Sequence, residues 1–163
     1  MYRYIYLFRH GQTEDNAKSV FSGWRDTKLT KRGVDDAKII ALRLKDKKIG
    51  IAFQTKLSRS KDTLKEVLKF HPECKVIVTN NRIIERNYGK LQGKTHYQYI
   101  KNNSPEKYDA FHRGYKKRPP EGESIKDVEK RTGPFIKNLL RLIKENKVNI
   151  AISAHGNSMR PLR

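Results

Sequence analysis

The chain has 163 residues, of which 36% are hydrophobic and 33% are charged, a balance typical of folded globular proteins and not of disordered chains. No apolar run approaches the roughly 20 residues that a membrane helix needs, and residues 1–9 lack the features of a signal peptide. The single cysteine, Cys74, excludes an intrachain disulfide. We therefore expect one domain over residues 1–163, located in the cytoplasm.

The charge of the chain is strongly positive, with 37 lysines and arginines against 17 acidic residues and a formal net charge of +20. Such an excess favours anionic partners, which include phosphorylated metabolites, acidic lipids and nucleic acids. The basic residues are dispersed, and the densest cluster, RGYKKR at residues 113–118, is short. A dispersed excess is more typical of a solvated surface than of a nucleic-acid face, so nucleic acid is the less favoured partner and a small phosphorylated metabolite stays open.

In chain order, strands and helices are predicted to alternate. Helical periodicity follows Thr30 and Ser124, which are suitable N-caps, and a further helix starts at Ser58 or Ser60. Gly133-Pro134 is predicted to interrupt the last helix and to kink it. Runs rich in β-branched and aromatic residues predict strands at residues 2–8, 49–53, 75–79 and 149–153, and helices are predicted at residues 30–45, 58–70 and from 124 onward.

This alternation predicts an α/β fold, a three-layer sandwich whose mostly parallel sheet carries helices on both faces. In such sheets ligands bind beyond the carboxyl ends of the strands. Residues 80–122 contain several glycines and prolines and show no clear periodicity. A segment of this length is usually functional or contains short elements of its own.

Two predicted strands end in similar sequences, FRHG at residues 8–11 and SAHG at residues 153–156. Because parallel strands end at the same edge of a sheet, His10 and His155 are expected to project from that edge together. The glycine after each histidine is expected to let a ligand approach the backbone.

A pair of imidazoles at a sheet edge is suited to phosphoryl transfer. A neutral imidazole, with an ordinary pKa of about 6.5, is a competent nucleophile near pH 7. Arg9 and Arg59 would supply fixed positive charge for the phosphoryl oxygens, and Glu85 could protonate a leaving group. From the pattern alone, a structural role for the histidines and a surface role for Arg59 and Glu85 stay open. No HxH, HExxH or CxxC motif is present, so no metal site is predicted.

Six segments, which together extend over nearly the whole chain, resemble the histidine phosphatase superfamily, specifically its phosphoglycerate mutase branch. They are LFRHGQTEDN (7–16), FSGWRDTKLTKRG (21–33), LSRSKDT (57–63), IERNYGKLQGK (84–94), PEGESIKDVEKRTGPF (120–135) and SAHGNSMRPL (153–162).

The resemblance implies a phosphoglycerate mutase-like fold and specific roles for single residues. By this likeness His10 is the nucleophile, Glu85 is the general acid, and Arg9, Arg59 and His155 form the phosphate pocket. Positions that match contacts to phosphate or glycerate are Asn16, Ser22, Gly23, Tyr88, Arg113, Gly156 and Asn157. The implied reaction interconverts 3-phosphoglycerate and 2-phosphoglycerate through a phosphohistidine, with 2,3-bisphosphoglycerate as the priming donor and no metal.

The chain departs from the mutase pattern at three places. His96 stands where the family mutases carry a lysine, and His112-Arg113 stands where they carry paired arginines. The segment between Arg113 and Glu123 is also short, as in the phosphatase branch. A phosphomonoester phosphatase that uses the same phosphohistidine is therefore the first alternative. A basic nucleic-acid-binding protein on an inactive form of the fold is the second.

The resemblance also bears on assembly. Mutases of this family often self-associate, so a homo-oligomer is expected as one possibility. The sequence ends at Arg163, shortly after His155, where relatives continue with further chain. The other expectation is that a further C-terminal segment, which this sequence lacks, packs over the region that follows His155.

Overall fold

The computed structural model describes residues 3–112 and 114–162, and its centre is a parallel β-sheet. Within the described residues the sheet has four strands in the order β1-β4-β2-β3. Their bounds are β1 Ile5–Arg9, β2 Ile51–Gln54, β3 Val76–Thr79 and β4 Ile150–Ala154. The mostly parallel sheet that the sequence predicts is confirmed.

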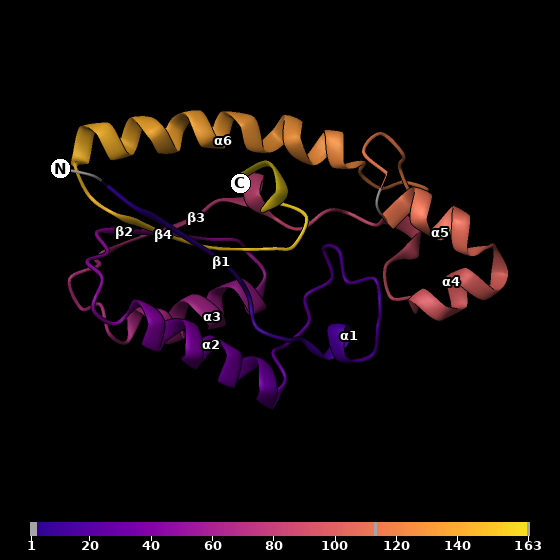
Figure 1. Cartoon of the computed structure of the whole chain (residues 1–163), viewed down its shortest axis with the longest axis horizontal. Helices are drawn as coiled ribbons and strands as arrows, with labels where there is room; N and C mark the ends of the chain where they lie inside the picture. The colour runs from indigo at the N-terminus through magenta and orange to yellow at the C-terminus, as the bar shows by residue number, and fades with distance from the viewer. Residues whose placement is uncertain (1–2, 113, 163) are drawn as a thin grey trace.

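Helices cover both faces of this sheet (Figure 1). Helices α2 (Lys31–Leu44) and α3 (Ser58–Leu68) lie on one face, and α6 (Ile125–Asn146) lies on the other. Successive side chains of a strand point to opposite faces, so Ala52 packs in the core on the α2 and α3 side while Phe53 packs against α6. The three-layer sandwich is confirmed, with one apolar core on each side of the sheet.

Helix α6 crosses the Gly133-Pro134 pair without a break, so the predicted interruption is wrong. Ser124 forms a capping box with Asp127 at its N-terminus. Pro134 is exposed, whereas Phe135 beside it is buried in the core. Burial of the apolar stripe on both sides of the proline holds the helix together although one backbone hydrogen bond is lost.

The first strand lies at an edge of the sheet. The sequence predicts a buried strand, but in β1 Ile5 is 40% exposed and only Phe8 is buried. The difference arises because β1 pairs with β4 alone among the described strands. An alternation of aromatic and aliphatic residues cannot distinguish an edge strand from a central one.

Short elements gather beyond the carboxyl ends of the strands (Figure 1). Residues 80–122 carry most of them, as the sequence predicts, and buried Phe21, Tyr88, Leu91 and Tyr99 form a separate apolar cluster there. None of the described helices combines the length and hydropathy that a bilayer span requires. The short elements are α1 (Glu14–Ala17), η1 (Asn81–Ile83), η2 (Gly89–Leu91), α4 (His96–Asn102), α5 (Pro105–His112) and η3 (Arg160–Leu162).

The loop after β1 crosses the first turn of α2 so closely that the two backbones are in contact. A Cβ atom on Gly11 would lie 2.0 Å from the carbonyl oxygen of Gly33, and one on Gly33 would lie 1.9 Å from the carbonyl oxygen of Gln12. Thr30 caps the helix at this crossing by accepting a hydrogen bond from the Gly33 N–H. Gly11 is therefore required by this crossing, which corrects the expectation that it makes room for a ligand.

We predict that Gly33→Ala lowers the free energy of unfolding by at least about 2 kcal/mol, because the added methyl group must displace backbone atoms. Gly133→Ala is the matched control, since a Cβ there meets nothing within 4 Å beyond its neighbours in the helix and lies in a helix interior. It should change the free energy of unfolding by less than about 1 kcal/mol, because the gain in helix propensity is opposed by contact of the new Cβ with the ring of the following Pro134. Urea denaturation measures both, and a stabilising Gly33→Ala would contradict the crossing.

Candidate active site

Two buried imidazoles meet at the carboxyl ends of β1 and β4. Arg9 is in register with Ala154, so the next residues of the two strands, His10 and His155, leave the sheet side by side. Their ring centroids are 5.1 Å apart, and the exposed fractions are 7% for His10 and 0% for His155. The expectation that one sheet edge brings both histidines together is confirmed.

The hydrogen bonds of His10 fix its tautomer. Nδ1 lies 2.7 Å from the carbonyl oxygen of Gly11, which can only accept, so Nδ1 carries the proton. Nε2 therefore presents its lone pair, which accepts a hydrogen bond from Nε of Arg59 at 3.3 Å. In this state Nε2 is the nucleophilic atom of the ring.

His155 presents a hydrogen-bond donor at the same place. Its Nε2 lies 2.8 Å from the Thr55 hydroxyl, whose oxygen also accepts from the Leu57 N–H. Among the described residues no other acceptor is found for the O–H of buried Thr55, so we assign Thr55 as the donor of this bond and place the proton of His155 on Nδ1. This buried Nδ1 has no hydrogen-bond partner among residues 3–112 and 114–162. An unpartnered buried donor beside a nucleophile is suited to an anionic ligand oxygen.

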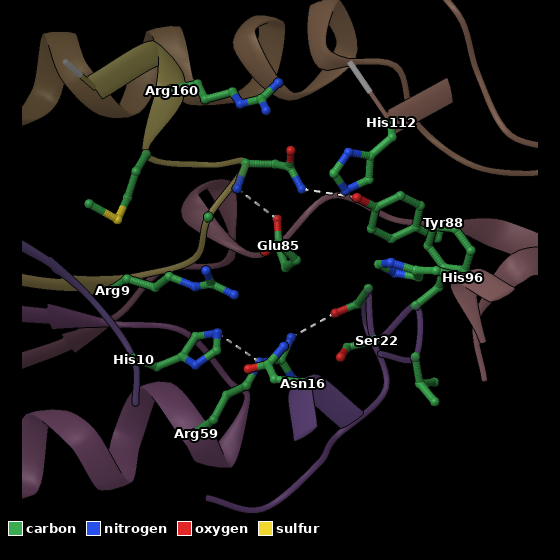
Figure 2. Close-up of a pocket in the computed structure, with 16 residues that line it drawn as sticks. Arg9, His10, Asn16, Ser22, Arg59, Glu85, Tyr88, His96, His112 and Arg160 are labelled. Atoms are coloured by element: carbon green, nitrogen blue, oxygen red, sulfur yellow. Dashed lines mark hydrogen bonds between the residues drawn. The ribbon is translucent and has the colours of Figure 1, made fainter. Parts of the chain in front are cut away.

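Two arginines provide positive charge next to the imidazoles. Arg59, in the first turn of α3, is 1% exposed and is fixed by hydrogen bonds from Nη1 to the Arg25 carbonyl (2.7 Å) and from Nη2 to the Gly23 carbonyl (2.8 Å). Arg9 extends from the end of β1 into the space between His10 and Glu85 (Figure 2). The guanidinium groups therefore border the nucleophilic nitrogen from two sides.

Glu85 is held on the opposite side by its backbone and by one carboxylate oxygen. Its carbonyl accepts hydrogen bonds from Trp24 Nε1 (2.7 Å) and Arg131 Nη2 (2.9 Å). Oε1 accepts from the backbone N–H groups of Arg86 (2.8 Å) and Asn157 (3.1 Å). These bonds leave Oε2 for a ligand and fix a largely buried carboxyl group at the cavity.

These side chains surround a cavity of about 370 Å³, a size suited to a small metabolite (Figure 2). His155 lies directly behind His10. Arg113 lies outside the described residues. The other sequence-predicted site residues all line the cavity: Arg9, His10, Asn16, Ser22, Gly23, Arg59, Glu85, Tyr88, Gly156 and Asn157.

Several of the predicted binding residues carry polar atoms suited to a ligand. The Asn16 side-chain oxygen caps α1 by accepting from the Thr13 N–H, which leaves its amide group for the cavity. The Ser22 hydroxyl is buried and has no hydrogen-bond partner in the described part of the chain. Asn157 Nδ2 donates to the Tyr88 hydroxyl at 3.3 Å.

Other site residues were not found from the sequence. Thr55, Trp24 and Arg131 orient site residues through single hydrogen bonds, and no sequence pattern marks such contacts. His96 was singled out only as a departure from the mutase pattern. The cavity-lining residues that sequence reasoning did not include are Val20, Phe21, His96, His112, Met159 and Arg160.

The environment keeps both central imidazoles neutral. Burial, together with the nearby guanidinium of Arg59, lowers the pKa of His10 to about 3. Burial, with the neighbouring His10 and Arg59, also lowers the pKa of His155 well below its ordinary value. At neutral pH the lone pair of His10 is therefore available.

Comparison with known families agrees with this geometry. The sequence model of the family described as "Histidine phosphatase superfamily (branch 1)" matches residues 5–163. The chain belongs to the histidine phosphatase superfamily. Mutases and phosphatases are among the proteins similar to this chain.

Among similar sequences, a 2,3-bisphosphoglycerate-dependent phosphoglycerate mutase of Chlamydia felis is 31% identical over 98% of this chain and 82% of its own length. A phosphoglycerate mutase of Schizosaccharomyces pombe is 36% identical over 97% of this chain and 76% of its own. The sequence likeness therefore favours the mutase branch, and the chain spans about four fifths of these relatives.

Among similar structures, a vanadate complex of a mycobacterial glucosyl-3-phosphoglycerate phosphatase has a TM-score of 0.85 at 29% identity and covers 99% of this chain and 80% of its own. A phosphoglycerate mutase of Bacillus anthracis, 22% identical with a TM-score of 0.83 and covering 97% and 77%, shares the fold. A phosphatase and a mutase thus share this architecture.

The lowered pKa values of His10 and His155 predict that the free energy of unfolding decreases as pH falls from 6.5 to 5. In this window the unfolded chain binds protons at these histidines and the folded chain does not, so acid favours unfolding. The slope should reach about 1.4 kcal/mol per pH unit for each such histidine.

Urea denaturation at several pH values measures this slope. His10→Gln should reduce it, because one buried imidazole is removed. Equal stability of the wild-type protein at pH 7 and pH 5 would contradict the neutral, buried state of the pair.

Proposed function

We propose that this protein is a phosphoglycerate mutase that interconverts 3-phosphoglycerate and 2-phosphoglycerate through a phosphohistidine on His10. The observation that carries the proposal is the exposed lone pair of Nε2 of His10 at a cavity lined by Arg9 and Arg59, with the ring of His155 5.1 Å away and its buried Nδ1 unpartnered among the described residues. This arrangement provides a nucleophile and a set of donors for the oxygens of one phosphoryl group. We place the enzyme in the cytoplasm, as a single domain.

In the first half-reaction Nε2 of His10 attacks phosphorus, the Nε2–P bond forms, and the bond from phosphorus to the ester oxygen breaks. Glu85 gives its proton to the departing oxygen through Oε2. Arg9, Arg59 and the Nδ1–H of His155 stabilise the charge on the three phosphoryl oxygens. The Nδ1–H bond to the Gly11 carbonyl holds the ring in the correct tautomer throughout.

In the second half-reaction the carboxylate of Glu85 takes a proton from the acceptor hydroxyl as that oxygen attacks phosphorus. The Nε2–P bond breaks, and the lone pair returns to Nε2. Asn16, Ser22, Gly23, Tyr88, Gly156 and Asn157 line the remaining cavity and would position the glycerate, and the sequence likeness adds Arg113. The polar groups at His10 fit a bisphosphorylated primer, and 2,3-bisphosphoglycerate would supply the first phosphoryl group.

A phosphomonoester phosphatase is the second candidate, and water then takes the place of the acceptor hydroxyl. The high structural similarity to a glucosyl-3-phosphoglycerate phosphatase favours it, as does the absence of the family lysine at His96. Both reactions use the same His10 and Glu85, and they differ in how well the pocket holds glycerate and excludes water.

We predict that incubation with 3-phosphoglycerate and a trace of 2,3-bisphosphoglycerate yields mainly 2-phosphoglycerate, with free phosphate as a minor product. Both products can be followed together by phosphorus NMR. Dominant free phosphate with negligible 2-phosphoglycerate would reject the mutase in favour of the phosphatase.

We also predict that Glu85→Gln lowers kcat by roughly 10²–10⁴-fold, because the amide cannot transfer a proton. Glu121→Gln is the matched control, since Glu121 is exposed and pairs with Lys90 away from the cavity. Steady-state kinetics with 3-phosphoglycerate measure both variants. Equal activity of the two variants would remove Glu85 from the mechanism.

A further inference from the structure

Two histidines form the wall of the cavity opposite the nucleophile. His96 is the first residue of α4 and His112 is the last residue of α5, and their ring centroids are 5.7 Å apart. Figure 2 shows both imidazoles directed into the cavity from the side opposite Arg9 and His10. One small ligand in this cavity can therefore contact His10 at one end and the histidine pair at the other.

The pair is fixed in place by packing. The Tyr108 hydroxyl is 3.1 Å from Nδ1 of His96, and the Tyr108 ring stacks on His112 with centroids 5.0 Å apart. Phe21 packs against His96 at a centroid distance of 4.1 Å. This packing limits the rotation of both rings and leaves Nε2 of His96 for a ligand. A preorganised wall of this kind loses little side-chain entropy on binding.

The charge of this wall depends on protonation. Burial and the neighbouring His112 lower the pKa of His96, so the His96 ring is largely neutral at neutral pH when no anion is near. A negatively charged group between the rings would favour their protonated forms, because opposite charges attract. Tyr108 contacts both rings, and the other titratable or charged groups that line the same cavity are Arg9, His10, Arg59, Glu85, Tyr88 and Arg160.

We propose that His96 and His112 form a proton-coupled subsite for the second acidic group of a phosphomonoester substrate. The proposal deepens the proposed function and rests on it, since His10 must bind the phosphoryl end. It identifies the substrate class as phosphorylated hydroxy acids, such as 3-phosphoglycerate. The affinity of the protein for these substrates should also rise as pH falls, because binding of each substrate molecule takes up a proton at His96 and His112.

Calorimetric titration tests the coupling with two ligands that share the phosphate group. 3-Phosphoglycerate carries a carboxylate, and glycerol 3-phosphate carries an uncharged hydroxymethyl group in its place. In two buffers of different ionisation enthalpy at pH 7, 3-phosphoglycerate should take up close to one proton more than glycerol 3-phosphate. The ratio of the two dissociation constants should change by up to about tenfold per pH unit between pH 8 and 6.

Variants identify the residues involved. The double variant His96→Gln, His112→Gln should lose the excess proton uptake and bind glycerol 3-phosphate as the wild type does, which also shows that it is folded. His96→Lys should keep the preference for 3-phosphoglycerate and lose much of its pH dependence, because the charge becomes permanent. Tyr97→Phe is the control on the same helix, since Tyr97 is 71% exposed, and it should change nothing.

The outcomes separate this inference from the proposed function. If both ligands bind but show equal proton uptake, a permanent charge such as Arg160 holds the carboxylate, and the subsite proposal is overturned while the proposed function stands. Excess uptake that persists in the double variant also overturns it. If the wild-type protein binds neither ligand, the proposed function itself fails.

Discussion

The central constraint of the structure is that two neutral imidazoles lie at the ends of neighbouring parallel strands. They lie beside guanidinium groups, which stay positively charged at any pH near neutral. The register of β1 and β4 sets the 5.1 Å between the rings of His10 and His155. Burial and adjacent positive charge suppress protonation of both rings. An anion can enter such a pocket with a large electrostatic gain, while a proton cannot easily occupy the nucleophilic nitrogen. The same burial and positive charge that favour unfolding in acid keep the lone pair of His10 available at neutral pH.

Hydrogen bonds from the surrounding elements hold this pair and Glu85 in place. Thr55 orients His155, the Gly11 carbonyl orients His10, and Trp24 and Arg131 hold the backbone of Glu85. Each of these contacts is a hydrogen bond to a buried group. Hydrogen bonds to fixed partners set the geometry of a site before a ligand binds. The short elements between β3 and α6 close the cavity on the substrate side, where the chain differs most from the mutase pattern.

Much of the site could be predicted from the sequence because its residues lie in short local motifs. Strand ends followed by His-Gly placed His10 and His155 at one edge, and the alternation of strands and helices gave the sandwich. The contact of Gly11 with Gly33 and the hydrogen bond from Thr55 join segments distant in sequence, and local periodicity carries no information about them. The uninterrupted course of α6 past Pro134 also depends on tertiary burial, which outweighs local propensity.

The phosphorylated intermediate is the central claim, and its position on the imidazole is its most direct test. The protein should be mixed with 2,3-bisphosphoglycerate, quenched in alkali within milliseconds to seconds, and studied by phosphorus–proton correlation NMR and peptide mass spectrometry. The geometry predicts one phosphoryl group on Nε2 of His10, because Nδ1 donates its proton to the Gly11 carbonyl. A phosphoryl group on Nδ1, on His155 or on no histidine at all would contradict the account.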